Sequence, residues 1–417
     1  LLSSLMGTAD TMMVSNVGSA AISAVSLVDA INILVIQALS ALAAGGAILC
    51  SQYLGSQNLK KAKRSAEQVL FVMLVLSCSL SLLCLIFRFP LLRLIFGTVD
   101  ADVMANSQIY FFFTLLSFPF IGLYDAGASI LRAQNNTKGP MTISILSNFL
   151  NIGGNAILIF VFGMGVAGAA ISTLVSRIFC AIVVIWQLRN PAEQIYVRNY
   201  FSIRPDWSLI KRVLFIGIPS GIENSMFQFG KLAIQSTVST LGTVAIAAQA
   251  MTSILEALNG IAAMGVGIGL MTVVGQCIGA KRKDEAIYYI KRLSWLSEIV
   301  ILISCAVVYL LAKPVTILGG METESARLCL QMVAFITITK PISWVLSFIP
   351  AYGMRAAGDV KFSMITSCIT MWTFRFCLCV YLIRVCGMGP MAVWIGMFTD
   401  WTVRAIVFGL RFKSGKW

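Results

Sequence analysis

Apolar stretches of about 20 residues recur from one end of this chain to the other. Examples are residues 69–87, 295–312 and 363–383. A helix needs about 20 apolar residues to cross the hydrocarbon core of a bilayer, and the strict alternation typical of a membrane barrel is absent. Since 58% of the residues are hydrophobic and only 12% are charged, the sequence predicts an all-α protein that crosses a membrane many times.

Glycine, proline and clusters of charge divide the apolar sequence into twelve predicted transmembrane helices. The first begins at Leu1, so we expect that helix to start upstream. Almost no chain remains for a soluble domain. The spans are residues 1–17, 20–53, 66–88, 103–131, 140–162, 166–188, 209–240, 243–277, 287–312, 325–353, 362–384 and 389–411.

The lysines and arginines at the ends of these spans predict how the chain is oriented. Twenty-one lie on the side that holds both termini. The opposite side holds only Arg88, Arg93, Lys313, Arg327 and Arg384. The positive-inside rule places the richer side, with both termini, in the cytoplasm, as expected for a multi-pass protein of the cell membrane. The net charge of +14 therefore indicates orientation and contact with anionic lipid rather than binding to nucleic acid.

The second half of the chain repeats the first. The sequence GGAILCSQYLGSQNLKKA at 45–62 aligns with GLMTVVGQCIGAKRKDEA at 269–286, so that Gln52 matches Gln276 at an offset of 224. Six helices separate the two copies, so both halves enter the membrane in the same direction. We therefore expect an N-lobe at 1–188, a cytoplasmic linker at 189–207 and a C-lobe at 208–417, arranged around a central cleft suited to alternating access.

Polar side chains of the N-lobe are predicted to converge at one depth. Asp10, Asn155 and Thr173 each lie seven or eight residues from the outer end of their helix, about 10–12 Å below the surface. Asn151 shares a helix face with Asn155, and Asn148 is within reach of that face. Because an apolar bundle penalises an ionised carboxylate, Asp10 is expected to bind a proton or a cation such as Na⁺. The alternative is a structural aspartate bonded to neighbouring amides.

Four motifs resemble the multidrug and toxic compound extrusion (MATE) transporters. They are ADTMMVSNVGSAAISAVSL, SQYLGSQNLKKA, LRAQNNTKGPM and GIPSGIENSMFQ, in that order along the chain. The resemblance implies a V-shaped pair of six-helix lobes. It also implies export of lipophilic, often cationic compounds, driven by inward flow of H⁺ or Na⁺, with no cofactor.

The resemblance also implies which residues hold the coupling cation. In well-studied members an aspartate on the first helix, an asparagine and an aspartate four residues apart on the fifth, and a threonine on the sixth form the site. Asp10, Asn151 and Thr173 match this pattern, whereas Asn155 stands where those members carry the second aspartate. One charge fewer favours H⁺ over Na⁺, and both remain open. In the second half the corresponding residues are Ile234, Phe374, Leu378 and Met397, so we expect the site only in the N-lobe.

Other intramembrane polar residues are candidates for contact with substrate or a second cation: Glu223, Glu256, Asn148 and Gln37. Glu223 follows Gly217 and Pro219, which permit a hinge, but it could instead simply pair with Lys231. Arg375 and Asp400 are predicted at similar depths, where a buried ion pair is expected to be structural.

Three alternative functions remain beside a drug exporter. A flippase of the same superfamily, moving lipid-linked glycans, would need cationic residues for pyrophosphate, and the candidates are mostly acidic or neutral. A membrane enzyme would need a catalytic set, yet the chain has no histidine, and nothing in it resembles the filter of a passive channel.

The expected partners are a small lipophilic or cationic substrate and membrane lipid, with no nucleic acid, for a monomeric protein. The 11 cysteines are expected to pack as small apolar residues.

Overall fold

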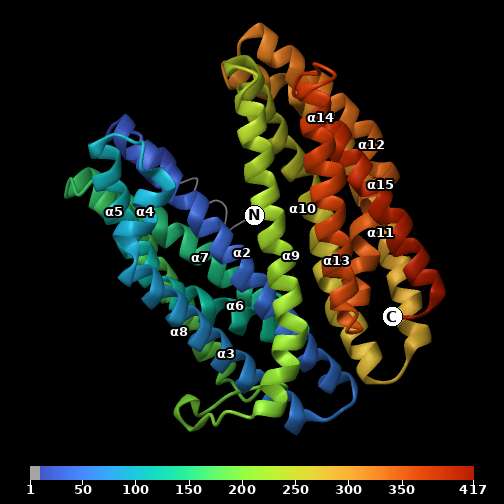
Figure 1. Ribbon diagram of the computed structural model, residues 1–417. Coiled ribbons are helices and arrows are strands. Elements are labelled where there is room, and N and C mark those ends of the chain that lie inside the picture. The colour runs from blue at the N-terminus through green and yellow to red at the C-terminus, as the bar shows by residue number, and fades with distance from the viewer. Residues whose placement is uncertain (1–9) are drawn as a thin grey trace. The chain divides into compact units, whose positions relative to one another are not determined.

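The computed structural model describes residues 10–417, and this part of the chain is helical, without a strand (Figure 1). Helices suit these sequences because lipid offers no hydrogen bonds, so each backbone group must be satisfied within its own segment. The first helices are α2 (Ser19–Gly55), α3 (Leu59–Ile86), α4 (Arg88–Phe96), α5 (Ala101–Leu116), α6 (Phe118–Ala133), α7 (Lys138–Asn155) and α8 (Val166–Leu188). They are followed by α9 (Trp207–Ser239), α10 (Thr243–Gly279), α11 (Lys283–Leu318), α12 (Thr323–Ala356), α13 (Val360–Thr370), α14 (Leu378–Arg384) and α15 (Met391–Ser414).

The predicted spans are recognisable in these helices. Nine helical segments of the described chain are long and apolar enough to cross a membrane, and the bent pair α5–α6 makes a tenth. The predicted span at 209–240 corresponds to α9, which has 33 residues but includes Glu223 and Lys231 and is not among the nine. Most of the predicted span at 1–17 lies outside the described residues, of which 10–14 are helical.

Several predicted spans are less regular than a single α-helix. The span predicted at 103–131 is two helices that bend by 42° around Ser117. The fifth span of each half includes a π-helical segment, Ala156–Val161 after α7 and Met371–Cys377 between α13 and α14. π-Helical turns occur often at functional sites, and one of these two directly follows Asn155.

The internal repeat is visible in the backbone as well as in the sequence. Gly18 and Gly242, which precede α2 and α10, both have positive φ angles (146° and 98°) and are 224 residues apart. Gln57 and Lys281, also 224 apart, have φ angles of 59° and 60° in the turns that follow those helices. Left-handed backbone is rare for residues other than glycine, so its recurrence at the repeat offset indicates two copies of one plan.

The described chain divides into two compact units, one ending at Gly221 and the other beginning at Ile222. This boundary falls inside α9 rather than in the predicted linker. The linker segment is bound to the first unit, because Gln134 accepts a hydrogen bond from Ile195 N (2.8 Å) and donates one to Ile195 O (3.2 Å). The first part of α9 packs on α2 so closely that a Cβ on Gly45 would meet Gly217 Cα at 2.8 Å.

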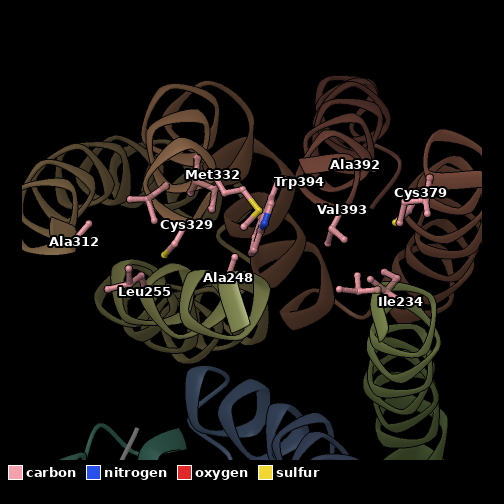
Figure 2. Close-up of a cluster of buried hydrophobic side chains, with 14 of the residues drawn as sticks. Ile234, Ala248, Leu255, Ala312, Cys329, Met332, Cys379, Ala392, Val393 and Trp394 are labelled. Carbon is pink, nitrogen blue, oxygen red and sulfur yellow. The ribbon is translucent and has the colours of Figure 1, made fainter. Parts of the chain in front are cut away.

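Each unit has its own apolar core. In the first unit, Val28, Phe111, Phe118 and Ala169 belong to a cluster formed by α2, α5, α6 and α8. In the second unit, side chains of α9, α10, α11, α12, α14 and α15 meet, as Figure 2 shows for Ile234, Ala248, Leu255, Met332, Cys379 and Trp394. These cores fix the helices that carry the polar residues described below.

Candidate functional site

Asp10 is buried inside the first unit, with 1% of its surface exposed. Its carboxylate is surrounded by side chains from α5, α7 and α8, which are far apart in sequence. A charged group so placed needs compensation from hydrogen bonds or an opposite charge, because it has lost contact with water.

Four side-chain donors provide that compensation. Asn155 Nδ2 and Asn151 Nδ2 donate to Asp10 Oδ1 at 2.7 and 3.2 Å. Thr173 Oγ1 and the Tyr110 hydroxyl donate to Oδ2, the latter at 3.2 Å. All four donors are at most 1% exposed. Hydrogen bonds to an ionised group are stronger than those between neutral groups, so this arrangement stabilises the carboxylate form.

The structure thus brings together the four residues that the sequence singled out. Asn151 also donates to Thr173 Oγ1 at 3.2 Å, so the cluster is internally connected. The helices that carry it, α7 and α8, lie close together. Ser172 Oγ donates to Asn151 O at 2.8 Å, and a Cβ on Gly154 would clash with Ser172 Oγ. The close packing of α7 against α8 therefore fixes the positions of Asn151 and Asn155.

Two other candidates from the sequence lie elsewhere in this unit. Asn148 is half-buried on α7, three residues before Asn151. Gln37 is exposed on α2.

Three further residues near Asp10 were not predicted from the sequence. Tyr110 resembled any aromatic residue of an apolar span. Asp29 lies on α2, and its Oδ1 is 3.0 Å from the Tyr110 hydroxyl oxygen, which also contacts Asp10. Arg177 interacts electrostatically with both aspartates and donates to Ser117 Oγ at 2.6 Å. A signal for it was available, since it follows Thr173 by four residues on the same helix face.

In the second unit, the counterparts of Asp10 and Thr173 are apolar. Ile234, the counterpart of Asp10, is 6% exposed and belongs to the cluster around Trp394 (Figure 2). Met397, the counterpart of Thr173, packs against the same cluster. The two copies therefore share a backbone plan, whereas the polar cluster belongs to the first.

The acidic candidates of the second unit are engaged in ion pairs. Glu223, 2% exposed, lies 2.6 Å from Arg355 Nη2 and accepts a hydrogen bond from Ser363, so its partner is Arg355 rather than Lys231. Glu256 lies 2.6 Å from Lys340 Nζ, whose side chain is 1% exposed. Neither arrangement was visible in the sequence, because each partner lies at least 84 residues away.

Arg375 and Asp400 form the buried ion pair that the sequence predicted, with Nη2 and Oδ2 2.8 Å apart. The sequence missed a third member, Arg404, whose Nε lies 3.5 Å from Asp400 Oδ1. Arg404 also donates to Thr370 Oγ1 at 3.1 Å and covers the ring of Phe227. Two guanidinium groups on one carboxylate hold α15 against the π-helical segment before α14.

Metal ligands of the usual kind are not gathered anywhere in residues 10–417: no group of three or more Cys, Asp or Glu is placed to hold an ion. Around Asp10, the groups directed at the carboxylate are N–H and O–H donors. The Oδ1 atoms of Asn151 and Asn155 are buried and have no hydrogen-bond partner within the described part of the chain. Rotation of either amide would present an oxygen to a bound proton or cation.

Comparison with known proteins shows the family of this chain. The family model described as MatE matches residues 1–157 and 219–381. A protein named "Probable multidrug resistance protein NorM" from Thermotoga maritima is 25% identical over 100% of this chain and 90% of its own length. An "Uncharacterized transporter YisQ" from Bacillus subtilis is 28% identical over 99% and 90%.

A solved structure has the same fold. The crystal structure of a MATE protein in a bent conformation superposes with a TM-score of 0.89 at 20% sequence identity, over 99% of this chain and 91% of that one. Since the family model covers most of the sequence, the chain belongs to the MatE family of membrane transporters.

Proposed function

We propose that this protein is a proton-driven antiporter that exports lipophilic, often cationic compounds from the cell, with Asp10 as the residue that binds the coupling proton. The observation that carries the proposal is the burial of the Asp10 carboxylate among four donors from three other helices. Such a carboxylate changes its interactions with α5, α7 and α8 when its charge changes.

The nature of the contacts favours H⁺ over Na⁺. Na⁺ needs several oxygen ligands, whereas N–H and O–H groups point at Asp10 in the described structure. Asn155 contributes no charge where a second carboxylate would attract a metal ion. A proton needs only one oxygen of Asp10 and one acceptor nearby, which a rotated Asn151 or Asn155 amide supplies.

Protonation of Asp10 would weaken the cluster. Each hydrogen bond to a charged group contributes about 1.5–3 kcal/mol, and a neutral carboxyl group accepts weaker bonds while donating one of its own. The first helix would then be held less firmly against α7 and α8. If substrate binding favours the ionised arrangement and protonation the other, each ligand expels the other, which is the energetic requirement for antiport.

The cargo and the orientation are also proposals. The name of the Thermotoga maritima relative supports drugs as cargo. The positive-inside rule supports a protein of the cell membrane with both termini in the cytoplasm. The fully buried cations of the described chain, Lys340, Arg375 and Arg404, each contact an acidic side chain, so they are not available for the pyrophosphate of a lipid-linked glycan.

Ethidium transport in everted membrane vesicles tests the proposal. The proton gradient and a Na⁺ gradient are collapsed separately for the wild type, for Asp10→Asn and for Asp284→Asn, a control at an exposed acid of α11. We expect transport to stop when the proton gradient is lost, to be absent in Asp10→Asn and to be normal in Asp284→Asn.

Three results would contradict parts of the proposal. Dependence on the Na⁺ gradient alone would exclude H⁺ as the coupling ion. Normal transport by Asp10→Asn would exclude Asp10 as its binding site. Glycolipid flipping without ethidium transport would replace drug export by the flippase function.

A further inference from the structure

The hydroxyl group of Tyr110 bridges two carboxylates. It lies 3.2 Å from Asp10 Oδ2 and 3.0 Å from Asp29 Oδ1. Asp29 is on α2 and Tyr110 is on α5, so the chain of three groups links three helices of the first unit.

The hydrogen bonds between Asp29, Tyr110 and Asp10 require one more proton than Tyr110 supplies. A phenol has a single proton and can donate it to one oxygen. The bridge contains two oxygen–oxygen contacts at hydrogen-bond distance, and each needs its own proton. One of the two carboxyl groups therefore carries the second proton.

The surroundings of the two acids indicate which one carries it. Asp10 accepts three further hydrogen bonds, from Asn151, Asn155 and Thr173, and these favour its ionised form. Among residues 10–417, Asp29 has only a long contact of 3.5 Å from Asn32 Nδ2 in addition to Tyr110. The hydrogen bonds therefore favour the proton on Asp29, which then donates to Tyr110 while Tyr110 donates to Asp10.

The two ends of the bridge also differ in access. Asp10 and Tyr110 are each 1% exposed, whereas Asp29 is only partly buried. A proton can thus reach Asp29 from outside the unit but cannot reach Asp10 directly. Arg177 is the cation that interacts with all three groups, and its charge favours a single proton on the pair over two.

We propose that Asp29 receives the coupling proton and passes it to Asp10 through Tyr110. The O–H bond of Asp29 breaks as its proton moves to Tyr110 Oη, and the original Tyr110 proton moves to Asp10 Oδ2. Tyr110 ends as a neutral phenol, Asp29 as a carboxylate and Asp10 as a carboxylic acid, so protons and charge balance. This proposal rests on the proposed role of Asp10 as the final proton site.

Proton release from the purified protein tests the route. In unbuffered detergent solution, ethidium is mixed with the protein in a stopped-flow instrument, and a pH indicator records the released protons. The amplitude reports whether Asp10 exchanges a proton, whereas the rate reports how the proton travels. The variants are Asp10→Asn, Asp29→Asn, Tyr110→Phe and the control Asp125→Asn, a half-buried acid of α6 that makes no hydrogen bond to Tyr110.

We expect Asp29→Asn and Tyr110→Phe to release protons with the wild-type amplitude but about a hundredfold more slowly, the usual effect of losing a positioned acid–base group. Formate, a small carboxylic acid, should restore the rate of Asp29→Asn. Asp125→Asn should behave as the wild type, and size-exclusion chromatography with thermal unfolding verifies that each variant is folded.

The route is overturned if Asp29→Asn keeps the wild-type rate, if it loses the amplitude, or if formate leaves a slowed variant unchanged. A wild-type signal from Asp10→Asn would instead overturn the proposed function, so the two failures are distinguishable.

Discussion

Nδ2 of Asn155 lies 2.7 Å from Oδ1 of Asp10, and both side chains are at most 1% exposed. This amide occupies the position at which the resemblance to MATE transporters implies a second aspartate. An amide can donate to an ionised neighbour, whereas two carboxylates at that distance cannot both be ionised unless a cation lies between them. The identity of residue 155 therefore bears directly on the coupling ion.

Asn155→Asp should give the transporter a response to Na⁺. With both carboxylates facing each other, a Na⁺ ion would relieve their repulsion and gain a second charged ligand. At pH 8, where protons are scarce, Na⁺ should stimulate ethidium transport by Asn155→Asp in proteoliposomes and leave the wild type unchanged. Asn148→Asp, which adds the same charge on the same helix, is the matched control. A variant indifferent to Na⁺ would show that residue 155 does not select the ion.

Thr173→Ala should move the pH dependence of transport upward. The Thr173 hydroxyl donates to the ionised form of Asp10, and a bond of this kind contributes about 1.5–3 kcal/mol, or roughly one to two pH units. Without it the proton binds at lower proton concentration, so the pH of half-maximal transport rises. Thr173→Ser keeps the hydroxyl and should keep the wild-type profile. A profile that shifts downward in Thr173→Ala would contradict the assignment of Asp10 as the ionised partner.

Asp400→Asn should destabilise the protein strongly. It leaves Arg375 and Arg404 buried without a counter-charge, with side chains 4% and 1% exposed, and such a loss costs about 3–5 kcal/mol. Glu324→Gln, which breaks the exposed pair with Arg327, should cost about 0–1 kcal/mol. Thermal unfolding in detergent compares the two variants. Equal stability would mean that the buried cluster has other compensation.

Gly45→Ala should separate α2 from α9. The added Cβ would meet backbone atoms of Gly217 at 2.8 Å, which cannot move aside as a side chain can, and overpacking costs about 1–3 kcal/mol. Gly153→Ala is the control, because its Cβ would meet nothing within 4 Å. It should be neutral or stabilising by up to about 1 kcal/mol. Thermal unfolding in detergent compares the two variants. A Gly45→Ala variant as stable as the wild type would show that α2 and α9 are not tightly packed at Gly45.

Much of the fold followed from the sequence because the bilayer permits few alternatives. Apolar length predicted the spans, and the offset of 224 predicted two copies that the φ angles of Gly18 and Gly242 now display. The bend at Ser117 and the π-helical segments were not predicted. Both change the local backbone geometry without changing the average hydrophobicity of the span. The boundary between units was placed in a polar linker, whereas Gln134 binds that linker to the first unit.

The candidate site was predicted from the depth of each residue in the membrane. This depth can be counted from the sequence for residues near the end of a helix. Asp10, Asn151, Asn155 and Thr173 could be placed at one level by counting residues. The same count was not applied to Asp29, and Tyr110 offered no signal in an aromatic-rich span. Partners such as Lys340 for Glu256 depend on helix rotation, which a single sequence with apolar residues on all sides of its helices does not specify.

The most direct measurement of the role of Asp10 is the pH dependence of ethidium affinity, recorded by fluorescence anisotropy with purified protein. If the proton on Asp10 and the substrate favour opposite states, acid must weaken ethidium binding by the wild type. Asp10→Asn, which resembles the protonated form, should bind weakly with no dependence on pH. An affinity that varies with pH equally in both proteins would show that the coupling proton binds elsewhere.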